Sequence, residues 1–454
     1  MSDTSRQQMI ARRLLGGGLF AFWGRVFSSL IAFVIGIILA RLLSPESFGS
    51  YSLALSVVTL MALIGGLGAD QAVVRLIPSA SDAAKIVFAR TGLVIASIGG
   101  LLAGIVIWLG AATLFQGPID APLLAENAFL LGLWCLFLVL QRQLSETFRA
   151  NHNIRNAELF AGMGRTGVLS GSLFLLAVLV TNSLGMMNYR VAVLCALFSV
   201  AATAIAAFVF LLNSIRGKFS LALNKSIFSI AIPLGFSALM ITMRGQVDLW
   251  LVAGISGTSD TALYTAAWRL AVLVLMPTWI VNAVVPPMIA ELFKSREIPL
   301  MESLVRSVAT VACIPAFLLC LVLILGAEPL LQLLYGEFYG DASTMLIFLV
   351  IAQFAAVLSG PAAVGMAMTG GERALVGIST LAVLFALVAG YFAGMAYGAN
   401  GVAASSAATL ILQSSAMACW FRMHLGIWPI ATLSPRRLMV LGRHYLPGTQ
   451  QRDM

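Results

Sequence analysis

Four charged side chains lie inside long apolar stretches of the chain: Arg25, Arg244, Asp248 and Arg269. A charge at the centre of a bilayer costs from about 2.5 kcal/mol on insertion scales to more than about 10 kcal/mol in simulations. Such side chains must therefore face protein or water, and each one is a candidate functional residue. Arg244 and Asp248 are four residues apart, so one helix would place them on the same face.

The three arginines outnumber the single carboxylate, which predicts a cavity that holds an anion. Arginine suits phosphate because its planar guanidinium donates two parallel, charge-assisted hydrogen bonds. We predict that Arg25, Arg244 and Arg269 bind the substrate. Two alternatives compete with this prediction. Arg25 and Arg269 are close enough to the helix ends to extend toward water, and Arg244 with Asp248 could be a structural ion pair.

Four further residues are candidates for coupling or gating. Asp248 is the intramembrane carboxylate and hence the candidate site of proton or sodium coupling, although Arg244 beside it stabilises the ionised form. Asp70 and Arg75 flank one end of an apolar stretch, and Pro233 interrupts another by removing a backbone donor. We predict a gating role for Asp70, Arg75 and Pro233, against the alternative that such features are ordinary in membrane helices.

The elements that carry these residues are predicted to span a membrane. Apolar residues make up 60% of the chain and charged residues only 10%, whereas soluble domains carry about 25% charged residues. A spanning helix needs about 20 mostly apolar residues. Twelve stretches meet this length: 18–40, 49–69, 88–112, 123–142, 158–180, 189–212, 227–254, 262–288, 304–326, 342–368, 374–395 and 400–421.

The distribution of basic residues predicts the orientation. If both termini are cytoplasmic, nearly all of the 27 Lys and Arg residues fall in cytoplasmic segments, and only Arg41 and Arg190 fall on the opposite side. This asymmetry agrees with the positive-inside rule. We therefore expect a multi-pass membrane protein with both ends in the cytoplasm.

A weak internal repeat predicts two halves of six helices each. ARLLSPESFGSYSLAL corresponds to VAGISGTSDTALYTAA, which aligns Tyr51 with Tyr264, and GAATLFQ corresponds to GAEPLLQ at nearly the same offset. Repeats of this kind are typical of transporters. The predicted fold is all-α, with six membrane-spanning helices in each half. Its parts are a cytoplasmic segment, a first bundle, a linker, a second bundle and a basic tail, over 1–17, 18–212, 213–226, 227–421 and 422–454.

No enzyme, cofactor or metal signature is present in the sequence. The chain lacks the GK[ST] phosphate loop of ATP-driven proteins, and His152, His424 and His444 are scattered. Basic residues in a membrane protein act mainly as topology signals, so the net charge of +9 does not indicate nucleic-acid binding. We expect a protein that is not an enzyme and that needs no cofactor or metal.

Several stretches resemble the bacterial polysaccharide flippases of the multidrug/oligosaccharidyl-lipid/polysaccharide (MOP) exporter superfamily. They are ARLLSPESFGSYSLALSVVTLMALIGGLGADQAVVRLIP, VDLWLVAG followed by ALYTAAWRLA, and GAEPLLQLLYGEFYGDAST. The resemblance implies two six-helix bundles around a central cavity. It also implies transport of undecaprenyl-diphosphate-linked oligosaccharide across the bacterial inner membrane for O-antigen, capsule or exopolysaccharide synthesis. It implies the lipid bilayer, and polysaccharide polymerase and chain-length proteins, as partners.

The resemblance leaves two alternatives open. An ion-coupled drug or cation antiporter of the same superfamily would carry more acid than base in its cavity. For a member of the lipid II flippase branch, the resemblance implies fourteen helices, whereas this sequence predicts twelve. The resemblance places Arg25, Arg244 and Arg269 on helices where family members carry cavity cations.

Overall fold

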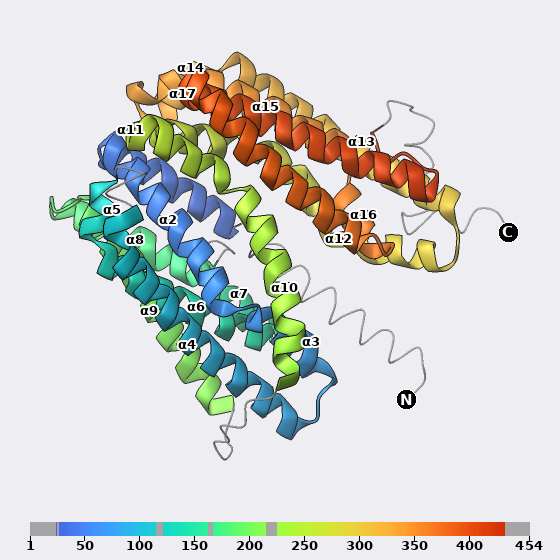
Figure 1. Cartoon of the computed structure of the whole chain (residues 1–454), viewed down its shortest axis with the longest axis horizontal. Helices are drawn as coiled ribbons and strands as arrows, with labels where there is room; N and C mark the ends of the chain where they lie inside the picture. The colour runs from blue at the N-terminus through green and yellow to red at the C-terminus, as the bar shows by residue number, and fades with distance from the viewer. Residues whose placement is uncertain (1–23, 25–26, 115–120, 162–166, 215–224, 432–454) are drawn as a thin grey trace, which may run out of the picture. The chain divides into compact units, whose positions relative to one another are not determined.

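The computed structural model describes residue 24 and residues 27–114, 121–161, 167–214 and 225–431. Every regular element in these described residues is a helix, either an α-helix or a short 3-10 helix (Figure 1). The chain divides into two compact units, Met1–Ala262 and Leu263–Met454, called unit 1 and unit 2 below. The predicted all-α fold class is thus confirmed over the part of the chain that the structure describes.

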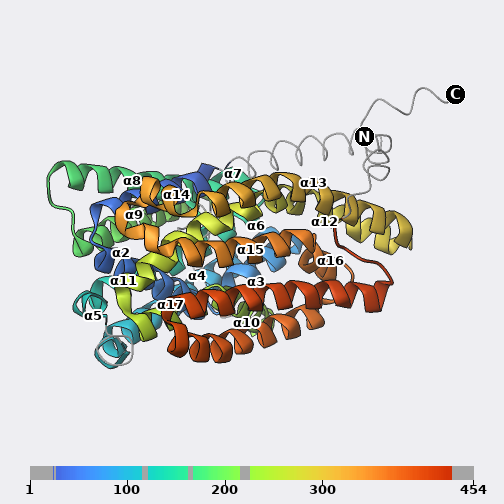
Figure 2. The ribbon, with the colours of Figure 1, turned by 90° about the horizontal axis from the view of Figure 1, so that it is seen from above.

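Unit 1 is built around one central helix. An apolar helix, Phe27–Leu42, comes first. It is followed by α2 (Pro45–Gly66), α3 (Ala69–Leu76), η1 (Ile77–Ser79), α4 (Asp82–Leu114), α5 (Pro122–Glu126), α6 (Ala128–Ala150), α7 (Ile154–Phe160), α8 (Val168–Ser183), α9 (Tyr189–Ser214), α10 (Lys225–Arg244) and the larger part of α11 (Val247–Ala271). Helix α6 packs on α2, α3, α4, α7 and α9, and α4, α6 and α9 run side by side (Figures 1 and 2).

Unit 2 contains the end of α11 and the elements that follow it. These are η2 (Val272–Leu275), α12 (Met276–Lys294), α13 (Ile298–Leu325), α14 (Ala327–Tyr335), η3 (Glu337–Ala342), α15 (Ser343–Leu358), α16 (Ala362–Met368) and α17 (Glu372–Leu425). Helix α15 packs between α13 and α17, and α12 packs on α13 and α16.

Glycines allow the helices of unit 1 to approach each other closely. A Cβ on Gly65 would overlap the backbone oxygen of Gly99, and a Cβ on Gly104 would lie 2.6 Å from the backbone oxygen of Gly132. Small residues commonly permit such backbone contacts between membrane helices. The glycines therefore set the close packing of α2, α4 and α6.

The chain breaks between α2 and α3 at two residues with left-handed backbone. Helix α2 ends at Gly66, and Leu67 and Gly68 follow with φ of 47° and 73°. A Cβ on Gly68 would overlap the backbone of α10 at Ala231 and Gly235. Gly68 is thus required both by its backbone conformation and by the close approach of α10.

The prediction of one continuous helix over 227–254 is wrong. Helix α10 ends at Arg244, and α11 begins at Val247. The backbone N–H groups of Gly245 and Gln246 bond three residues back, to the carbonyls of Thr242 and Met243, and so tighten and end the helix. Gly245 favours this break, because glycine is a weak helix former.

Two other predicted breaks each consist of a single glycine with positive φ. Gly257 has φ of 88° inside α11, and Gly398 has φ of 60° inside α17. These residues separate the predicted spans 227–254 from 262–288 and 374–395 from 400–421. Each pair of spans is thus joined by a sharp kink instead of a loop.

Nine helices in the described residues are long and apolar enough to cross a membrane, and Phe27–Leu42 and Val168–Ser183 are shorter apolar helices. Two of the nine, Val247–Thr278 and Glu372–Leu425, contain the glycine kinks. The total of twelve spans stays a prediction. Helix α10 packs on α2 and α3 within unit 1, and the six-plus-six division of the chain likewise stays a prediction.

Candidate functional site

Arg25 lies outside the described residues, and its predicted role stays a prediction. Its neighbour Gly24 is described. An added Cβ on Gly24 would lie 3.7 Å from the Cβ of Glu158, so Gly24 packs against α7.

Arg244 and Asp248 lie on either side of the break between α10 and α11. The Arg244 Nη1 and Asp248 Oδ2 atoms are 3.7 Å apart, and the two side chains are 15% and 4% exposed. This distance is that of an ion pair without a direct hydrogen bond. The Arg244 Nε atom is buried without a hydrogen-bond partner among the described residues. Arg244 therefore keeps donor capacity for a further acceptor.

Arg269 lies in unit 2, half-buried in the last turn of α11. Its charge acts on the phenol of Tyr335, at the end of α14. Burial raises the pKa of Tyr335 to about 12, and the positive charge of Arg269 opposes part of that rise. Arg244 belongs to unit 1, so a cavity shared by the three arginines stays a prediction.

The predicted gating residues fall in different surroundings. Asp70, in the first turn of α3, is buried, and its Oδ2 atom accepts a hydrogen bond of 3.1 Å from Arg142 Nη2 of α6. Arg75, in the last turn of α3, is exposed. Pro233 lies exposed inside α10, where its carbonyl accepts a hydrogen bond from the Ser237 hydroxyl. The structure thus pairs Asp70 with Arg142 and does not bring Asp70 and Arg75 together.

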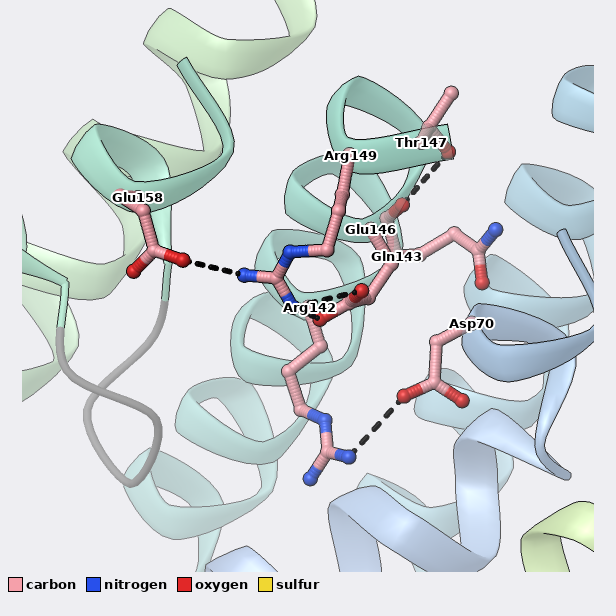
Figure 3. A network of polar contacts seen from close by, with 7 residues as sticks. All are labelled: Asp70, Arg142, Gln143, Glu146, Thr147, Arg149 and Glu158. Atoms are coloured by element: carbon pink, nitrogen blue, oxygen red, sulfur yellow. Dashed lines mark hydrogen bonds and ion pairs between the residues drawn. The ribbon is translucent and has the colours of Figure 1, made fainter. Parts of the chain in front are cut away.

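A network of buried charges on α6 was not predicted from the sequence. Arg149 Nη1 donates to both carboxylate oxygens of Glu146, at 2.8 and 3.0 Å, and Arg149 Nη2 donates to Glu158 Oε1 of α7 at 3.0 Å (Figure 3). Glu146 and Glu158 are 5% and 2% exposed. With Asp70 and Arg142, these residues tie α3, α6 and α7 together by charge-assisted hydrogen bonds.

The predicted fourth span, 123–142, ends before most of this network. Arg142 and Arg149 then counted only as cytoplasmic topology signals. In the structure α6 continues to Ala150, so Arg142, Glu146 and Arg149 follow one another at helical spacing. This spacing was the signal available in the sequence. The partners Asp70 and Glu158 lie on other elements, and their pairing required the tertiary structure.

The described residues contain no group of three or more His, Cys, Asp or Glu side chains that could hold a metal ion. The charged groups deep in unit 1 are arginines and carboxylates that hold one another. Such pairs position helices or bind polar ligands.

Comparison with known families gives one match that covers most of the chain. The family model described as polysaccharide biosynthesis protein matches residues 14–293. This range includes all seven residues predicted to bind, couple or gate. No curated protein sequence matches the chain significantly.

Solved structures share the fold at low sequence identity. An inward-facing multidrug resistance MATE family transporter of the MOP superfamily is 16% identical, with a TM-score of 0.75 over 90% of this chain and 98% of its own. The lipid II flippase MurJ in an inward closed conformation is 14% identical, with a TM-score of 0.69 over 89% and 87%.

A third solved structure is a MOP superfamily transporter from Pyrococcus furiosus, which is 17% identical with a TM-score of 0.62 over 91% of this chain and 95% of its own. At these identities the likeness shows the fold alone. Together with the family match, it places the chain among multi-pass membrane transporters. The chain belongs to the polysaccharide biosynthesis protein family and has the fold of the MOP superfamily transporters.

Proposed function

We propose that the protein is a flippase that moves undecaprenyl-diphosphate-linked oligosaccharide from the cytoplasmic to the outer leaflet of the inner membrane by alternating access. One observation carries the proposal. The match to polysaccharide biosynthesis proteins covers residues 14–293, the part of the chain that holds Arg25, Arg244 and Arg269. A diphosphate is the anionic group of such a substrate, and arginine is the side chain best suited to it.

Arg244 is the candidate whose surroundings support binding most directly. Its side chain is largely buried, its ion pair with Asp248 is long, and its Nε atom has no hydrogen-bond partner in the described part of the chain. A buried donor without a partner destabilises the folded chain unless an acceptor arrives. A phosphate oxygen would supply that acceptor.

The cycle also needs a driving force. Moving one charge across 100 mV of membrane potential is worth about 2.3 kcal/mol, which is enough to bias the return of the empty carrier. Asp248 is the candidate for proton or sodium coupling, and Asp70, Arg75 and Pro233 are the candidates for the gate. Polysaccharide polymerase and chain-length proteins would receive the glycan on the outer side.

The fold is shared with two other transporter classes, a multidrug transporter and a lipid II flippase. The family match favours a polysaccharide substrate over both. A drug or cation antiporter would also need an excess of carboxylate in its cavity. In unit 1 the carboxylates of Asp70, Glu146 and Glu158 are held by arginines.

Complementation of a flippase-null strain tests the proposal. The wild-type chain should restore export of the glycan. Arg25→Ala, Arg244→Ala and Arg269→Ala should each reduce export while the protein remains in the membrane at normal amounts. Arg190→Ala, at an exposed arginine outside the candidate binding and gating residues, measures the effect of removing a positive charge elsewhere. Full export by all three variants would contradict the cationic site.

A further inference from the structure

A small pocket lies in unit 1 at the break between α2 and α3. Apolar residues of α2 and α6 form part of its lining, and the rest includes Asp70, Gln71, Arg142, Gln143, Gly68 and Gly235. The pocket volume of about 10 Å³ is near the minimum that holds one water molecule. It can therefore admit a single oxygen-sized group and not a whole sugar ring.

Gln143 is the unusual member of this lining. Its side chain is 1% exposed, and neither the amide nitrogen nor the amide oxygen has a hydrogen-bond partner in the described part of the chain. Its backbone oxygen, in contrast, accepts a bond of 2.7 Å from the Thr147 hydroxyl (Figure 3). A buried amide normally bonds to protein or to an ordered water. We therefore expect the Gln143 amide to bond to a bound group.

Gly92 of α4 makes room for the Gln143 amide. A Cβ at Gly92 would overlap the Gln143 Nε2 atom and would lie 2.9 Å from Val73 Cγ2. The amide thus fits against a bare stretch of backbone, beside the pocket that Gln143 lines.

The electrostatics of the pocket select the class of ligand. Asp70 and Arg142 neutralise each other through one oxygen and one nitrogen, so the site has no excess charge to attract an ion. Arg142 disfavours a cation and Asp70 disfavours an anion. The carboxylate still offers an acceptor, the guanidinium still offers donors, and an amide offers both. A hydroxyl, which donates and accepts, is the neutral group that matches this set.

We propose that this pocket is a hydroxyl-binding subsite formed by Asp70, Arg142 and Gln143. The hydroxyl comes either from the glycan of the lipid-linked substrate or from a bound water molecule. The first source rests on the proposed function, whereas the second does not. In either case the Gln143 amide turns from Gly92 toward the pocket to bond the ligand.

Two variants on the same helix test the proposal. Gln143→Leu removes the amide at nearly constant volume. Gln141→Leu is the matched control, because the Gln141 Nε2 atom donates to Thr203 Oγ1 at 2.6 Å and to the Ala161 carbonyl at 3.3 Å. Leucine at 141 should lower the melting temperature of the purified protein, since it breaks the two hydrogen bonds that the Gln141 amide nitrogen makes within the protein.

The melting temperature of Gln143→Leu identifies the source. If a water is bound, the variant melts below the wild type without substrate, and a high-resolution structure shows that water within hydrogen-bond distance of Gln143. If the glycan supplies the hydroxyl, the substrate-free variant melts at or above the wild type. Lipid-linked oligosaccharide extracted from the producing cells then raises its melting temperature less than that of the wild type, while sugar-free undecaprenyl diphosphate raises both equally.

The opposite pattern would overturn the subsite. In that case Gln143→Leu melts at or above the wild type, and both lipids shift the two proteins equally, as expected for an empty pocket. A wild-type protein whose melting temperature responds to neither lipid contradicts the proposed function. The melting temperatures of Gln143→Leu and the wild type without substrate still decide whether the pocket holds a water.

Discussion

Among the single residues of unit 1, the arginines of α6 form ion pairs with buried carboxylates. Arg149 holds the buried carboxylates of Glu146 and Glu158 at once. Removing one partner from a buried ion pair costs about 3–5 kcal/mol, because the other charge is left uncompensated in a poorly solvating interior. The partial exposure of Arg149, 26%, reduces this cost through solvent screening.

We predict that Arg149→Met destabilises the protein by at least about 2 kcal/mol. Thermal unfolding of the detergent-solubilised protein measures the effect. Arg75→Met is the control, since Arg75 is exposed on α3. The triple variant with Glu146→Gln and Glu158→Gln should recover much of the loss, because neither side chain then carries the negative charge that Arg149 balances. An unchanged melting temperature for Arg149→Met would show that the network contributes nothing.

A double-mutant cycle tests the pair between Asp70 and Arg142. Asp70→Asn and Arg142→Met should each destabilise the chain. The double variant should lose less than the sum by about 0.5–3 kcal/mol, the coupling expected for contacting charges. Additive losses would mean that the 3.1 Å contact between Arg142 Nη2 and Asp70 Oδ2 carries no interaction energy.

Some of these charged residues can be predicted from the sequence, and others cannot, for physical reasons. An isolated charge in an apolar stretch is conspicuous, which led to Arg244, Asp248 and Arg269. Arg142 and Arg149 were assigned to a loop because positive charges usually flank membrane helices. Their carboxylate partners are supplied by α3 and α7, and no local pattern could have named them.

Among the elements, the lengths of the apolar stretches predict where the helices lie. Glycine residues mark where those helices break. Gly257 and Gly398 separate spans that were predicted separately, because glycine adopts positive φ at little cost. The break at Gly245 was missed, since the apolar run continues through it. Helix breaks inside an apolar run leave only a weak compositional signal.

Substitution of Gly68 tests the close contact between α10 and the break that separates α2 from α3. We predict that Gly68→Ala destabilises unit 1 by more than about 1 kcal/mol, since alanine disfavours a φ of 73° and its Cβ would collide with the backbone of α10. Gly66→Ala is the matched control, because a Cβ there meets nothing within 4 Å. Equal melting temperatures for the two variants would contradict the close contact between α10 and the break.

For the whole molecule, the orientation in the membrane stays a prediction, and it decides the direction in which substrate would be moved. The positive-inside asymmetry places the loop after α14 outside and the turn between α12 and α13 inside. In a cysteine-free background, Glu337→Cys should react with a membrane-impermeant thiol reagent added to intact cells, and Ser295→Cys should react only after lysis. Both positions are exposed. The reverse pattern would overturn the assigned orientation.

Transport by the purified protein shows whether arginines carry a diphosphate-linked glycan across the membrane. Proteoliposomes would be loaded with fluorescent undecaprenyl-diphosphate oligosaccharide, and its arrival in the outer leaflet would be followed by a quencher outside. We predict translocation by the wild-type chain and a rate about tenfold or more lower for Arg244→Ala, the loss expected for a charge-assisted hydrogen bond worth about 1.5–3 kcal/mol. Equal rates for wild type, Arg244→Ala and protein-free vesicles would contradict transport of the glycan by this protein.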